Sequence, residues 1–205
     1  MIEGIDGAGK RTLADALEGV IDGRVARMAF PRYGMDVHAD LIQDALHGRL
    51  GPFGDDVYGM AMLYALDRRA AAPDLRAALD THDYVLLDRY VASNAAFGAA
   101  RLHQGVAGPY VAWVREIELA RFAVPAPHAH LLLRVPPEIA AERSTRRAAE
   151  DAGRGRDTWE ADDALQSRVA AVYDGLADTD WLAPWHVVDG TTTPDVAELV
   201  KKLAE

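Results

Sequence analysis

A glycine-rich run near the start of the chain restricts its possible folds more than any other feature. The run is Gly4, Ile5, Asp6, Gly7, Ala8, Gly9, Lys10, Arg11 and Thr12. Two of its glycines and the lysine have the spacing G-x-x-x-x-G-K, which is typical of a loop that binds phosphate through backbone N–H groups. Apolar residues follow at helical spacing from Leu13 to Leu17, so we expect a helix whose N-terminus faces the anion. The sequence therefore predicts a strand, a phosphate loop at residues 4–12 and a helix in succession.

The residue after Lys10 departs from this motif. A serine or threonine normally binds Mg²⁺ at that position, but this chain has Arg11, followed by Thr12. Either Thr12 or a ligand elsewhere must then serve the metal, and Arg11 can add positive charge at the transferred phosphoryl group. The alternative is a glycine-rich turn without a ligand, which the complete spacing of the motif disfavours.

Composition excludes several classes of protein. A formal net charge of −10 argues against broad binding of duplex nucleic acid, which needs a basic face. The chain has no cysteine, which rules out disulfides and thiolate chemistry. No apolar run approaches the roughly 18 residues that span a bilayer, and the start Met1-Ile2-Glu3 is not a signal peptide. We therefore expect a cytoplasmic protein that binds neither membrane nor nucleic acid.

Short apolar runs alternate with helical patterns along the chain. The expected strands are residues 1–3, 24–30, 84–87, 130–135 and 185–188, and the first is so short that the natural start could lie upstream. Helical spacing covers residues 10–21, 37–46, 55–79, 93–121, 137 onward, 165–176 and 196–203, with Pro73 as an expected break and residues 105–109 as an interruption. This alternation predicts one α/β domain over residues 1–205, with a five-stranded parallel sheet flanked by helices.

Chemically distinctive residues follow two of these strands. Phe30 opens the loop Phe30-Pro31-Arg32-Tyr33-Gly34, and Asp88-Arg89 follows the apolar run of the third strand. In open parallel sheets the carboxyl ends of the strands line the ligand crevice. Asp88 can hold Mg²⁺ through water as a Walker B acid does, and Arg89 can clamp a phosphate with two N–H groups. An ordinary Pro-Gly turn remains an alternative for the first loop.

Two helical patterns carry further polar candidates. Tyr64, Asp67 and Arg68 have the spacing i, i+3, i+4 and can face one site, although a solvated acid–base pair is the simpler alternative. Ser93 and Asn94 should open the next helix, where either could also serve as the N-cap. His128 and His130 fall on one face of a strand without a third metal ligand, so we expect them to be structural or exposed.

An arginine-rich segment interrupts the acidic chain. Arginines stand at positions 143, 146, 147, 154 and 156, with Gly153 and Gly155 between them. As a lid at about residues 141–156, the segment could bring guanidinium groups to a transferring phosphoryl and exclude water. A solvated loop is the alternative. Asp157 and Glu160 then have the spacing of a capping box before the next helix, which would give Glu160 a structural role.

Taken together, these motifs resemble those of bacterial thymidylate kinases over nearly the whole chain. The resemblance rests on Glu3 to Lys10, Phe30-Pro31-Arg32-Tyr33, Asp67-Arg68 and Asp88-Arg89-Tyr90-Val91-Ala92-Ser93-Asn94. Arg11 is similar to the variant phosphate loop of some actinobacterial members. The resemblance implies a P-loop fold of the nucleoside-monophosphate-kinase type. It also implies transfer of the γ-phosphoryl of ATP to dTMP, with Mg²⁺, giving dTDP and ADP for dTTP biosynthesis, in a homodimer.

The resemblance also implies roles for individual residues. ATP would bind residues 4–12, and catalysis would involve Asp6, Lys10, Arg11, Arg89 and the lid arginines Arg147 and Arg154. The acceptor dTMP would contact Asp6, Phe30, Tyr33, Tyr64, Arg68, Arg89, Ser93, Asn94, Phe97, Asp157 and Trp159. The metal would lie beside Asp6, Asp88 and Glu160. Arg68 would bind thymine, Tyr64 would stack on the base in place of the usual Phe, and Asn94 would meet the base edge.

Two positions depart from the family pattern. Phe97 stands where close relatives carry Tyr beside the 2′ position of the sugar, so discrimination against ribonucleotides is in question. Trp159 stands where Tyr is common, which leaves its contact with the sugar open. The same motifs allow two alternative functions. One is a kinase for dUMP, dCMP or a purine monophosphate, and the other is a nucleotide-binding protein without turnover.

Overall fold

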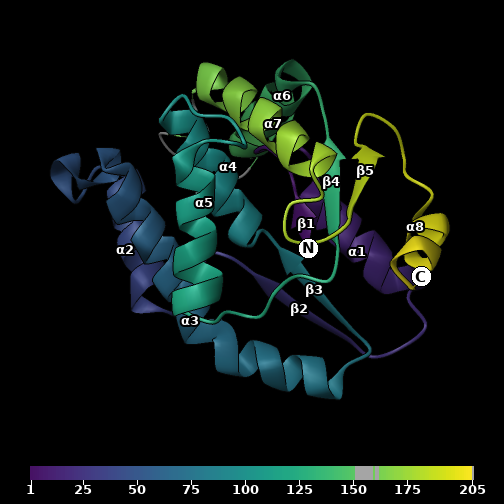
Figure 1. Cartoon of the computed structure of the whole chain (residues 1–205). Coiled ribbons are helices and arrows are strands. Elements are labelled where there is room, and N and C mark those ends of the chain that lie inside the picture. Colours follow the sequence, from purple (N-terminus) through teal and green to yellow (C-terminus); the bar gives the residue numbers. More distant parts are fainter. Residues whose placement is uncertain (151–158, 160–161, 205) are drawn as a thin grey trace.

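Five parallel strands form the central sheet of the computed structural model, in the order β2-β3-β1-β4-β5 (Figure 1). The structure describes residues 1–150, 159 and 162–204, without the side chains of residues 147, 148 and 150. The strands are β1 (Ile2–Glu3), β2 (Val25–Ala29), β3 (Tyr84–Asp88), β4 (His130–Arg134) and β5 (Trp185–Asp189). The predicted α/β class and sheet are therefore confirmed, including the short first strand.

The register of the sheet brings separate sequence motifs to one edge. Ile2 of β1 pairs with Asp88 of β3 on one side and with Leu131 of β4 on the other. Ala29, the last residue of β2, also pairs with Asp88. Since all these strands are parallel, their carboxyl ends place the phosphate loop, the Phe30 loop and the Asp88-Arg89 pair beside one another.

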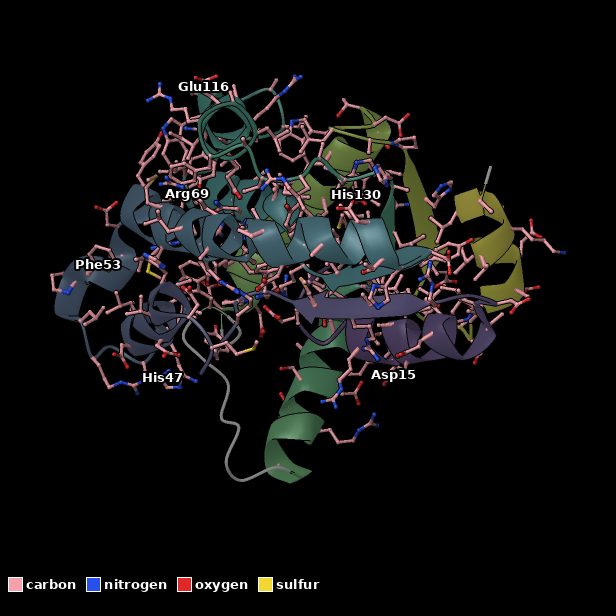
Figure 2. The ribbon with its side chains drawn as sticks, turned by 90° about the horizontal axis from the view of Figure 1, so that it is seen from below. Asp15, His47, Phe53, Arg69, Glu116 and His130 are labelled. Atoms are coloured by element: carbon pink, nitrogen blue, oxygen red, sulfur yellow. The ribbon has the colours of Figure 1, made fainter. Side chains whose placement is uncertain are left out.

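Helices cover both faces of the sheet. They are α1 (Lys10–Val20), α2 (Val37–Leu46), α3 (Val57–Thr81), α4 (Val91–Arg101), α5 (Pro109–Arg115), α6 (Pro137–Glu150), α7 (Asp163–Asp178) and α8 (Val196–Ala204), with a 3₁₀ turn η1 (Gly51–Asp55) and a π-helical segment η2 (Glu116–Arg121). Helices α3, α4 and α7 pack on one face, and α1 and α8 pack together on the other (Figures 1 and 2). Among the described residues, no helix is long and apolar enough to cross a membrane.

The apolar core lies between the sheet and these helices. Ile2, Leu87 and Leu131 supply it from the three central strands, Leu17 from α1 and Leu176 from α7, and each is at most 2% exposed. The helices contribute one apolar face each, whereas β3 and β4 are apolar on both faces. That pattern is typical of strands buried in a parallel sheet.

Two expectations about helices are wrong, and one is confirmed. Helix α3 continues through Pro73, which lies on the exposed side, where the helix can lose one backbone hydrogen bond to water. Helix α4 begins at Val91, so Ser93 and Asn94 lie inside its first turn and neither is the N-cap. Residues 93–121 form three helical segments, and the predicted interruption at residues 105–109 falls between the first two.

The expected lid at about residues 141–156 is described only in part. Residues 141–150 belong to helix α6, which begins at Pro137 as predicted, and residues 151–156 lie outside the described part of the chain. The predicted capping box is wrong, because α7 begins at Asp163 with Asp162 as its N-cap. The Asp162 carboxylate accepts a hydrogen bond of 2.8 Å from the N–H of Leu165.

Candidate active site

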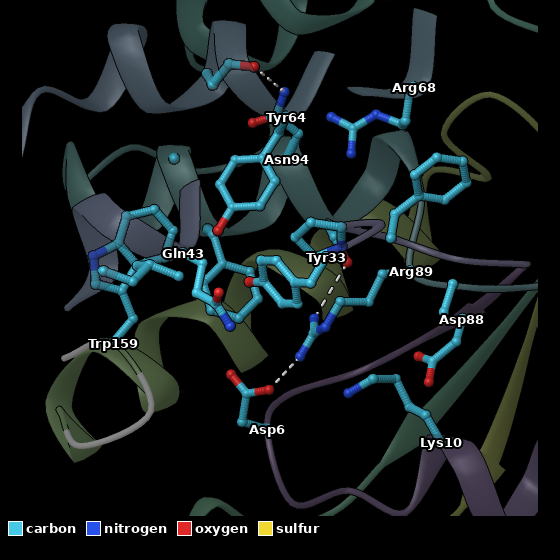
Figure 3. Close-up of a pocket in the computed structure, with 18 of the residues that line it drawn as sticks. Asp6, Lys10, Tyr33, Gln43, Tyr64, Arg68, Asp88, Arg89, Asn94 and Trp159 are labelled. Carbon is cyan, nitrogen blue, oxygen red and sulfur yellow. Dashed lines mark hydrogen bonds and ion pairs between the residues drawn. The ribbon is translucent and has the colours of Figure 1, made fainter. Parts of the chain in front are cut away.

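A cavity of about 620 Å³ lies at the carboxyl edge of the sheet (Figure 3). It extends from the phosphate loop to the start of helix α4 and the side of α3. Its lining includes Asp6, Gly7, Gly9, Lys10, Arg11, Thr12, Phe30, Tyr33, Tyr64, Arg68, Asp88, Arg89, Ser93, Asn94, Phe97, Arg101 and Trp159. Polar groups thus gather at both ends of one cavity, with aromatic rings between them.

The phosphate loop needs glycine for space as well as for conformation. Gly4, Gly7 and Gly9 have φ angles of 144°, 81° and 100°, which residues with side chains rarely adopt. A Cβ at Gly4 would lie 2.7 Å from the carbonyl oxygen of Leu133, and one at Gly7 would lie 2.0 Å from that of Ala140. The loop is therefore wedged against β4 and α6, with the N-terminus of α1 directly behind it.

Lys10 is folded back over this loop. Its ammonium group donates hydrogen bonds of 3.1 Å to the carbonyl of Gly4 and 3.0 Å to that of Ile5. The side chain is buried, and burial together with the nearby Arg89 guanidinium lowers the pKa of Lys10 to about 8. A buried cation whose hydrogen bonds within the described part of the chain go only to neutral carbonyls is poised to exchange them for phosphate oxygens.

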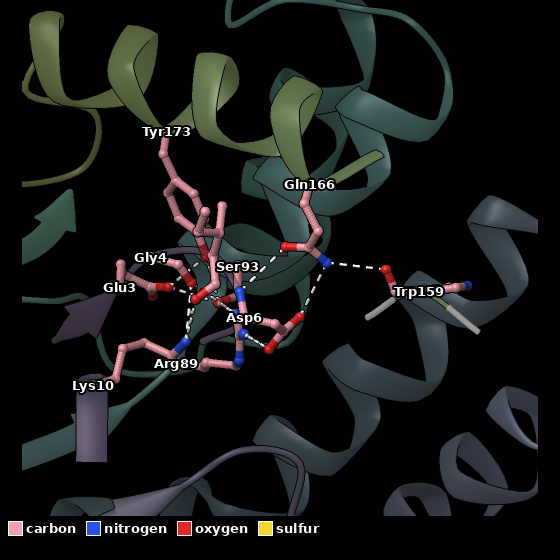
Figure 4. Close-up of polar contacts among 10 residues, drawn as sticks. Glu3, Gly4, Asp6, Lys10, Arg89, Ser93, Trp159, Gln166 and Tyr173 are labelled. Carbon is pink, nitrogen blue, oxygen red and sulfur yellow. Dashed lines mark hydrogen bonds and ion pairs between the residues drawn. The ribbon is translucent and has the colours of Figure 1, made fainter. Parts of the chain in front are cut away.

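Asp6 and Arg89 form an ion pair across the mouth of the loop. The Arg89 Nη2 donates to Asp6 Oδ1 at 2.5 Å, and Nη1 reaches Gly4 O and Ser93 Oγ at 3.3 Å each (Figure 4). Burial favours the neutral acid, but Arg89 and then Lys10 hold the pKa of Asp6 below its usual value. Arg89 has a φ of 63°, a left-handed conformation that is uncommon outside glycine and often marks functional sites.

A buried acid on β1 holds this end of the site in place. Glu3 is fully buried, and its carboxylate accepts hydrogen bonds from Tyr90 N at 2.9 Å, Ser93 Oγ at 2.6 Å and Tyr173 Oη at 2.9 Å. It thereby connects the central strand to the start of α4 and to helix α7 (Figure 4). A buried carboxylate is tolerated only with such partners, so Glu3 fixes the position of Ser93 beside Arg89.

Asp88 has the chemistry of a metal ligand. Its Oδ1 atom is buried and has no hydrogen-bond partner among the described residues, although it lies at the end of β3 and lines the cavity. An unsatisfied buried carboxylate oxygen is rare in proteins and often faces an ion or water. Mg²⁺ prefers carboxylate oxygen and typically takes only one or two from the protein, so Asp88 fits such an ion.

The opposite end of the cavity carries a second buried ion pair. Arg68 of α3 donates to both carboxylate oxygens of Glu118, with Nε at 2.5 Å from Oε2 and Nη2 at 2.8 Å from Oε1. Burial lowers the pKa of Arg68, but the adjacent Glu118 more than offsets this and raises it above its usual value. Asn94 of α4 donates to the same Glu118 Oε1 at 2.8 Å and to the carbonyl of Ala61 at 3.1 Å.

Aromatic rings form the wall between the two ends. Phe97 stacks on Trp159 with centroids 6.1 Å apart and an interplanar angle of 21°, and Tyr64 also contacts Trp159 at 6.1 Å. The Arg89 guanidinium lies 5.1 Å from the centre of the Phe97 ring, and that of Arg101 lies 4.5 Å from a Trp159 ring. A flat apolar ligand group could thus lie between the polar ends.

Comparison with known proteins assigns the chain to a family. The family model "Thymidylate kinase" matches residues 2–198. The chain belongs to the thymidylate kinase family. It is 50% identical over 196 residues to the thymidylate kinase of Mycobacterium tuberculosis, covering 94% of this chain and 92% of that protein. The thymidylate kinase of Xanthomonas oryzae pv. oryzae is 34% identical over 197 residues, covering 95% and 76%. That of Bdellovibrio bacteriovorus is 26% identical over 214 residues, covering 100% and 94%.

Most of the site residues expected of a thymidylate kinase come together in the cavity. Gly4, Ile5 and Ala8 form the body of the phosphate loop behind it, and the other described candidates line it directly. Arg154, Asp157 and Glu160 lie outside the described residues, as does the side chain of Arg147 on α6. Asp67 does not face the site with Arg68, because it is buried against Arg32, whose Nε lies 2.7 Å from its carboxylate. His130 is buried and stacked on Trp185, and His128 is exposed.

Sequence reasoning missed three polar residues that support this thymidylate kinase site: Glu3, Glu118 and Gln166. Gln166 is buried and accepts from Asp6 N at 3.2 Å, and it donates to Asp6 Oδ2 at 3.3 Å and to the carbonyl of Trp159 at 3.0 Å. The one available signal was an acid in a central strand at Glu3. Glu118 and Gln166 occur in helices, where polar residues usually face solvent.

Proposed function

We propose that this chain transfers the γ-phosphoryl group of ATP to dTMP, giving dTDP and ADP. The observation that carries the proposal is a single cavity lined at one end by a phosphate loop and at the other by Arg68 and Asn94. A donor nucleotide at the loop and an acceptor base at the far end would place the two phosphates between them. Membership of the thymidylate kinase family supports the same pair of substrates.

The donor would bind at residues 4–12. Its phosphates would take the backbone N–H groups of the loop, and Lys10 would exchange the carbonyls of Gly4 and Ile5 for phosphate oxygens. Arg11 and Thr12 line the same cavity from the first turn of α1, and both are exposed. Arg11 would add positive charge where the transferred group passes.

The acceptor would occupy the remainder of the cavity. Arg68 and Asn94 would bind the base edge, with Phe30, Tyr64 and Trp159 around the ring and Phe97 beside the sugar. Arg89 would bind the acceptor phosphate. Its guanidinium is held by Asp6 and Ser93, so its geometry is set before the substrate arrives. Tyr33 is 41% exposed at the cavity rim and would reach the phosphate region.

Mg²⁺ would be held by Asp88, with Asp6 beside it. The orphaned Oδ1 of Asp88 supports this assignment, and the absence of a hydroxyl after Lys10 makes an acidic ligand more important. The ion would neutralise charge on the phosphates during transfer. The protein's own part is to position the two phosphates and to surround the transferred group with Lys10, Arg11 and Arg89.

Residues beyond the described part complete the proposal. Arg147 and Arg154 would bring further positive charge to the transferred phosphoryl, Asp157 would contact the acceptor, and Glu160 would lie beside the metal. These roles rest on the family resemblance alone, as does assembly into a homodimer. Light scattering at several concentrations would measure the oligomeric state.

The direct test of the reaction is a panel of acceptors with ATP and Mg²⁺. Purified protein should phosphorylate dTMP, with dUMP, dCMP, dAMP and dGMP as the comparison set. Turnover of a purine acceptor but not of dTMP would contradict the proposal and favour another nucleotide kinase. Binding of ATP and dTMP without any product would favour a non-catalytic nucleotide-binding protein.

A substitution at Arg89 tests the site within that reaction. Arg89→Ala should lower kcat by at least ~10²-fold, because it removes a positioned cation from the developing charge. Arg121→Ala is the matched control, since Arg121 is exposed and pairs only with Glu116 among the described residues. Steady-state kinetics on both folded variants measure the loss of kcat. A near-normal kcat for Arg89→Ala would show that Arg89 takes no part in the mechanism.

A further inference from the structure

Glu118 is a buried charge that the reaction itself does not require. It lies in the π-helical segment η2, is completely buried and accepts three hydrogen bonds, two from Arg68 and one from Asn94. Burying a carboxylate is costly even when it is paired, and an apolar replacement is often as stable. π-helical turns occur frequently at functional sites.

Glu118 determines which way the Asn94 amide points. The Nδ2 group of Asn94 faces the Glu118 carboxylate at 2.8 Å and the Ala61 carbonyl at 3.1 Å. Both of these groups are hydrogen-bond acceptors only, so the atom facing them must be the NH₂ group, and both of its hydrogens are used. The Oδ1 atom is left on the other side, where it accepts a long hydrogen bond of 3.5 Å from the Tyr110 hydroxyl. Asn94 lines the cavity, so it offers the cavity a hydrogen-bond acceptor.

Glu118 also determines which hydrogen-bonding group Arg68 presents to the cavity. Two of the three guanidinium nitrogens, Nε and Nη2, donate to the carboxylate. The third, Nη1, has no hydrogen bond to any described residue, and Arg68 lines the cavity next to Asn94 (Figure 3). Since a guanidinium can only donate, the cavity meets a donor from Arg68 beside an acceptor from Asn94.

We propose that Glu118 is a positioning residue that sets this donor–acceptor order and so selects the base of the acceptor. The complementary edge is an N–H beside a carbonyl, as at N3 and O4 of thymine and uracil. Cytosine has the reverse order, with an acceptor at N3 and an amino group at C4. The inference rests on the proposed function, because it assumes that Arg68 and Asn94 face the acceptor base.

The mismatch with cytosine should be severe. An amino group would face the Arg68 donor, N3 would face the Asn94 acceptor, and neither side could rotate to adapt. Sites built around fixed buried hydrogen bonds reject a ligand that leaves them unpaired much more strongly than apolar pockets reject a change in size. A free asparagine could flip its amide and accept both bases, whereas the carboxylate and the Ala61 carbonyl prevent this flip.

The first experiment uses the unaltered protein and two acceptors of the same shape. Both dTMP and 5-methyl-dCMP carry the 5-methyl group, and they differ only in the polarity of the edge. We expect kcat/KM for dTMP to exceed that for 5-methyl-dCMP by at least ~10²-fold. Equal turnover of the two acceptors would overturn the inference while leaving the kinase function intact. Failure to phosphorylate dTMP at all would instead contradict the proposed function.

The second experiment changes Glu118 itself. In Glu118→Gln, one of the two acceptor oxygens becomes a donor, so the side chain can no longer satisfy Arg68 and Asn94 together. The ratio of kcat/KM for dTMP to that for 5-methyl-dCMP should fall at least ~10-fold. Glu116→Gln is the matched control in the same segment, because Glu116 is exposed and pairs with Arg121. Circular dichroism verifies that each variant is folded.

The outcomes separate a positioning role from a structural one. A merely structural Glu118 would lower kcat/KM for both acceptors by the same factor, and an unchanged ratio would overturn the inference. A reduced ratio in Glu118→Gln, with the control unchanged, supports it. If Glu118→Gln does not fold, the comparison of the two acceptors on the unaltered protein still decides whether the order of donor and acceptor is fixed.

Discussion

Phe97 is an apolar residue in the part of the cavity where we propose that the acceptor sugar lies. Its ring is 8% exposed and lies between the Arg89 guanidinium and the Trp159 ring. It therefore holds two other site residues in place by contact alone. Because phenylalanine has no hydroxyl, it can make no hydrogen bond near the sugar. The side chain therefore has no polar group that could distinguish a deoxyribose from a ribose.

Adding that hydroxyl should change sugar selectivity. Phe97→Tyr should raise the ratio of kcat/KM for dTMP to that for the ribose analogue of dTMP by about 10-fold. The reason is that the added hydroxyl places one polar group beside the 2′ position of the sugar. Phe122→Tyr is the control, since Phe122 is not among the residues that line the cavity. Kinetics with both acceptors measure the effect, and an unchanged ratio would remove Phe97 from this role.

At the residue scale, the sequence predicts the groups whose chemistry forms part of a local motif. Lys10, Asp88 and Arg89 could be found because each follows a glycine-rich loop or an apolar strand. Glu118 could not, since its partner Arg68 is 50 positions away in the sequence. An acid in a helix has the same appearance in a sequence whether it is solvated or buried against an arginine.

Among the elements, helix α7 connects the phosphate-loop end of the cavity to its aromatic wall. Gln166 on its second turn bonds to the backbone and side chain of Asp6 and to the carbonyl of Trp159 (Figure 4). One amide therefore joins the phosphate loop to the aromatic wall. Any displacement of α7 moves the Asp6–Arg89 ion pair and Trp159 together.

Removing this amide should affect both stability and activity. Gln166→Ala leaves the partly buried N–H of Asp6 without that partner and removes a buried amide, so the free energy of unfolding should fall by about 1–3 kcal/mol. It should also lower kcat/KM for dTMP at least ~10-fold, since Asp6 and Arg89 lose their alignment. Ser167→Ala is the control, because Ser167 is exposed and bonds only within α7 among the described residues. Urea unfolding and kinetics test the prediction, which fails if the two variants behave alike.

The strands and the existence of the helices could be predicted from the sequence, because each has a clear apolar pattern. Each end of all five strands was predicted to within one residue, because buried parallel strands are short apolar runs. Helix ends were less predictable, since they depend on contacts made after folding. Pro73 permits a continuous α3 at an exposed position, and Asp162 caps α7 in preference to the capping-box pair at Asp157 and Glu160.

At the scale of the whole molecule, a buried histidine makes stability depend on pH. His130 on β4 is fully buried and stacked on Trp185 with centroids 4.2 Å apart, and neither ring nitrogen has a partner among the described residues. Burial lowers the pKa of His130 to about 3. An unfolded chain would bind a proton near pH 6.5, so the folded state binds fewer protons between these two values.

Stability should therefore fall as the pH drops from about 6.5 toward 3, by up to about 1.4 kcal/mol per pH unit from this residue. His130→Phe keeps an aromatic ring against Trp185 and should flatten this dependence, whereas the exposed His128→Gln should leave it unchanged. Free energies of unfolding across this pH range measure the slopes. Identical slopes in His130→Phe and the unaltered protein would show that His130 does not cause the loss.

Lys10 has one further consequence, which concerns the heat of nucleotide binding. With a pKa of about 8 while it rests on the carbonyls of Gly4 and Ile5, a share of the ligand-free molecules carries a neutral amine near neutral pH. A polyphosphate beside it favours the ammonium form, so binding draws a fraction of a proton from solution. The heat recorded by calorimetry would then contain the ionisation enthalpy of the buffer, and apparent affinity would weaken as the solution becomes more alkaline.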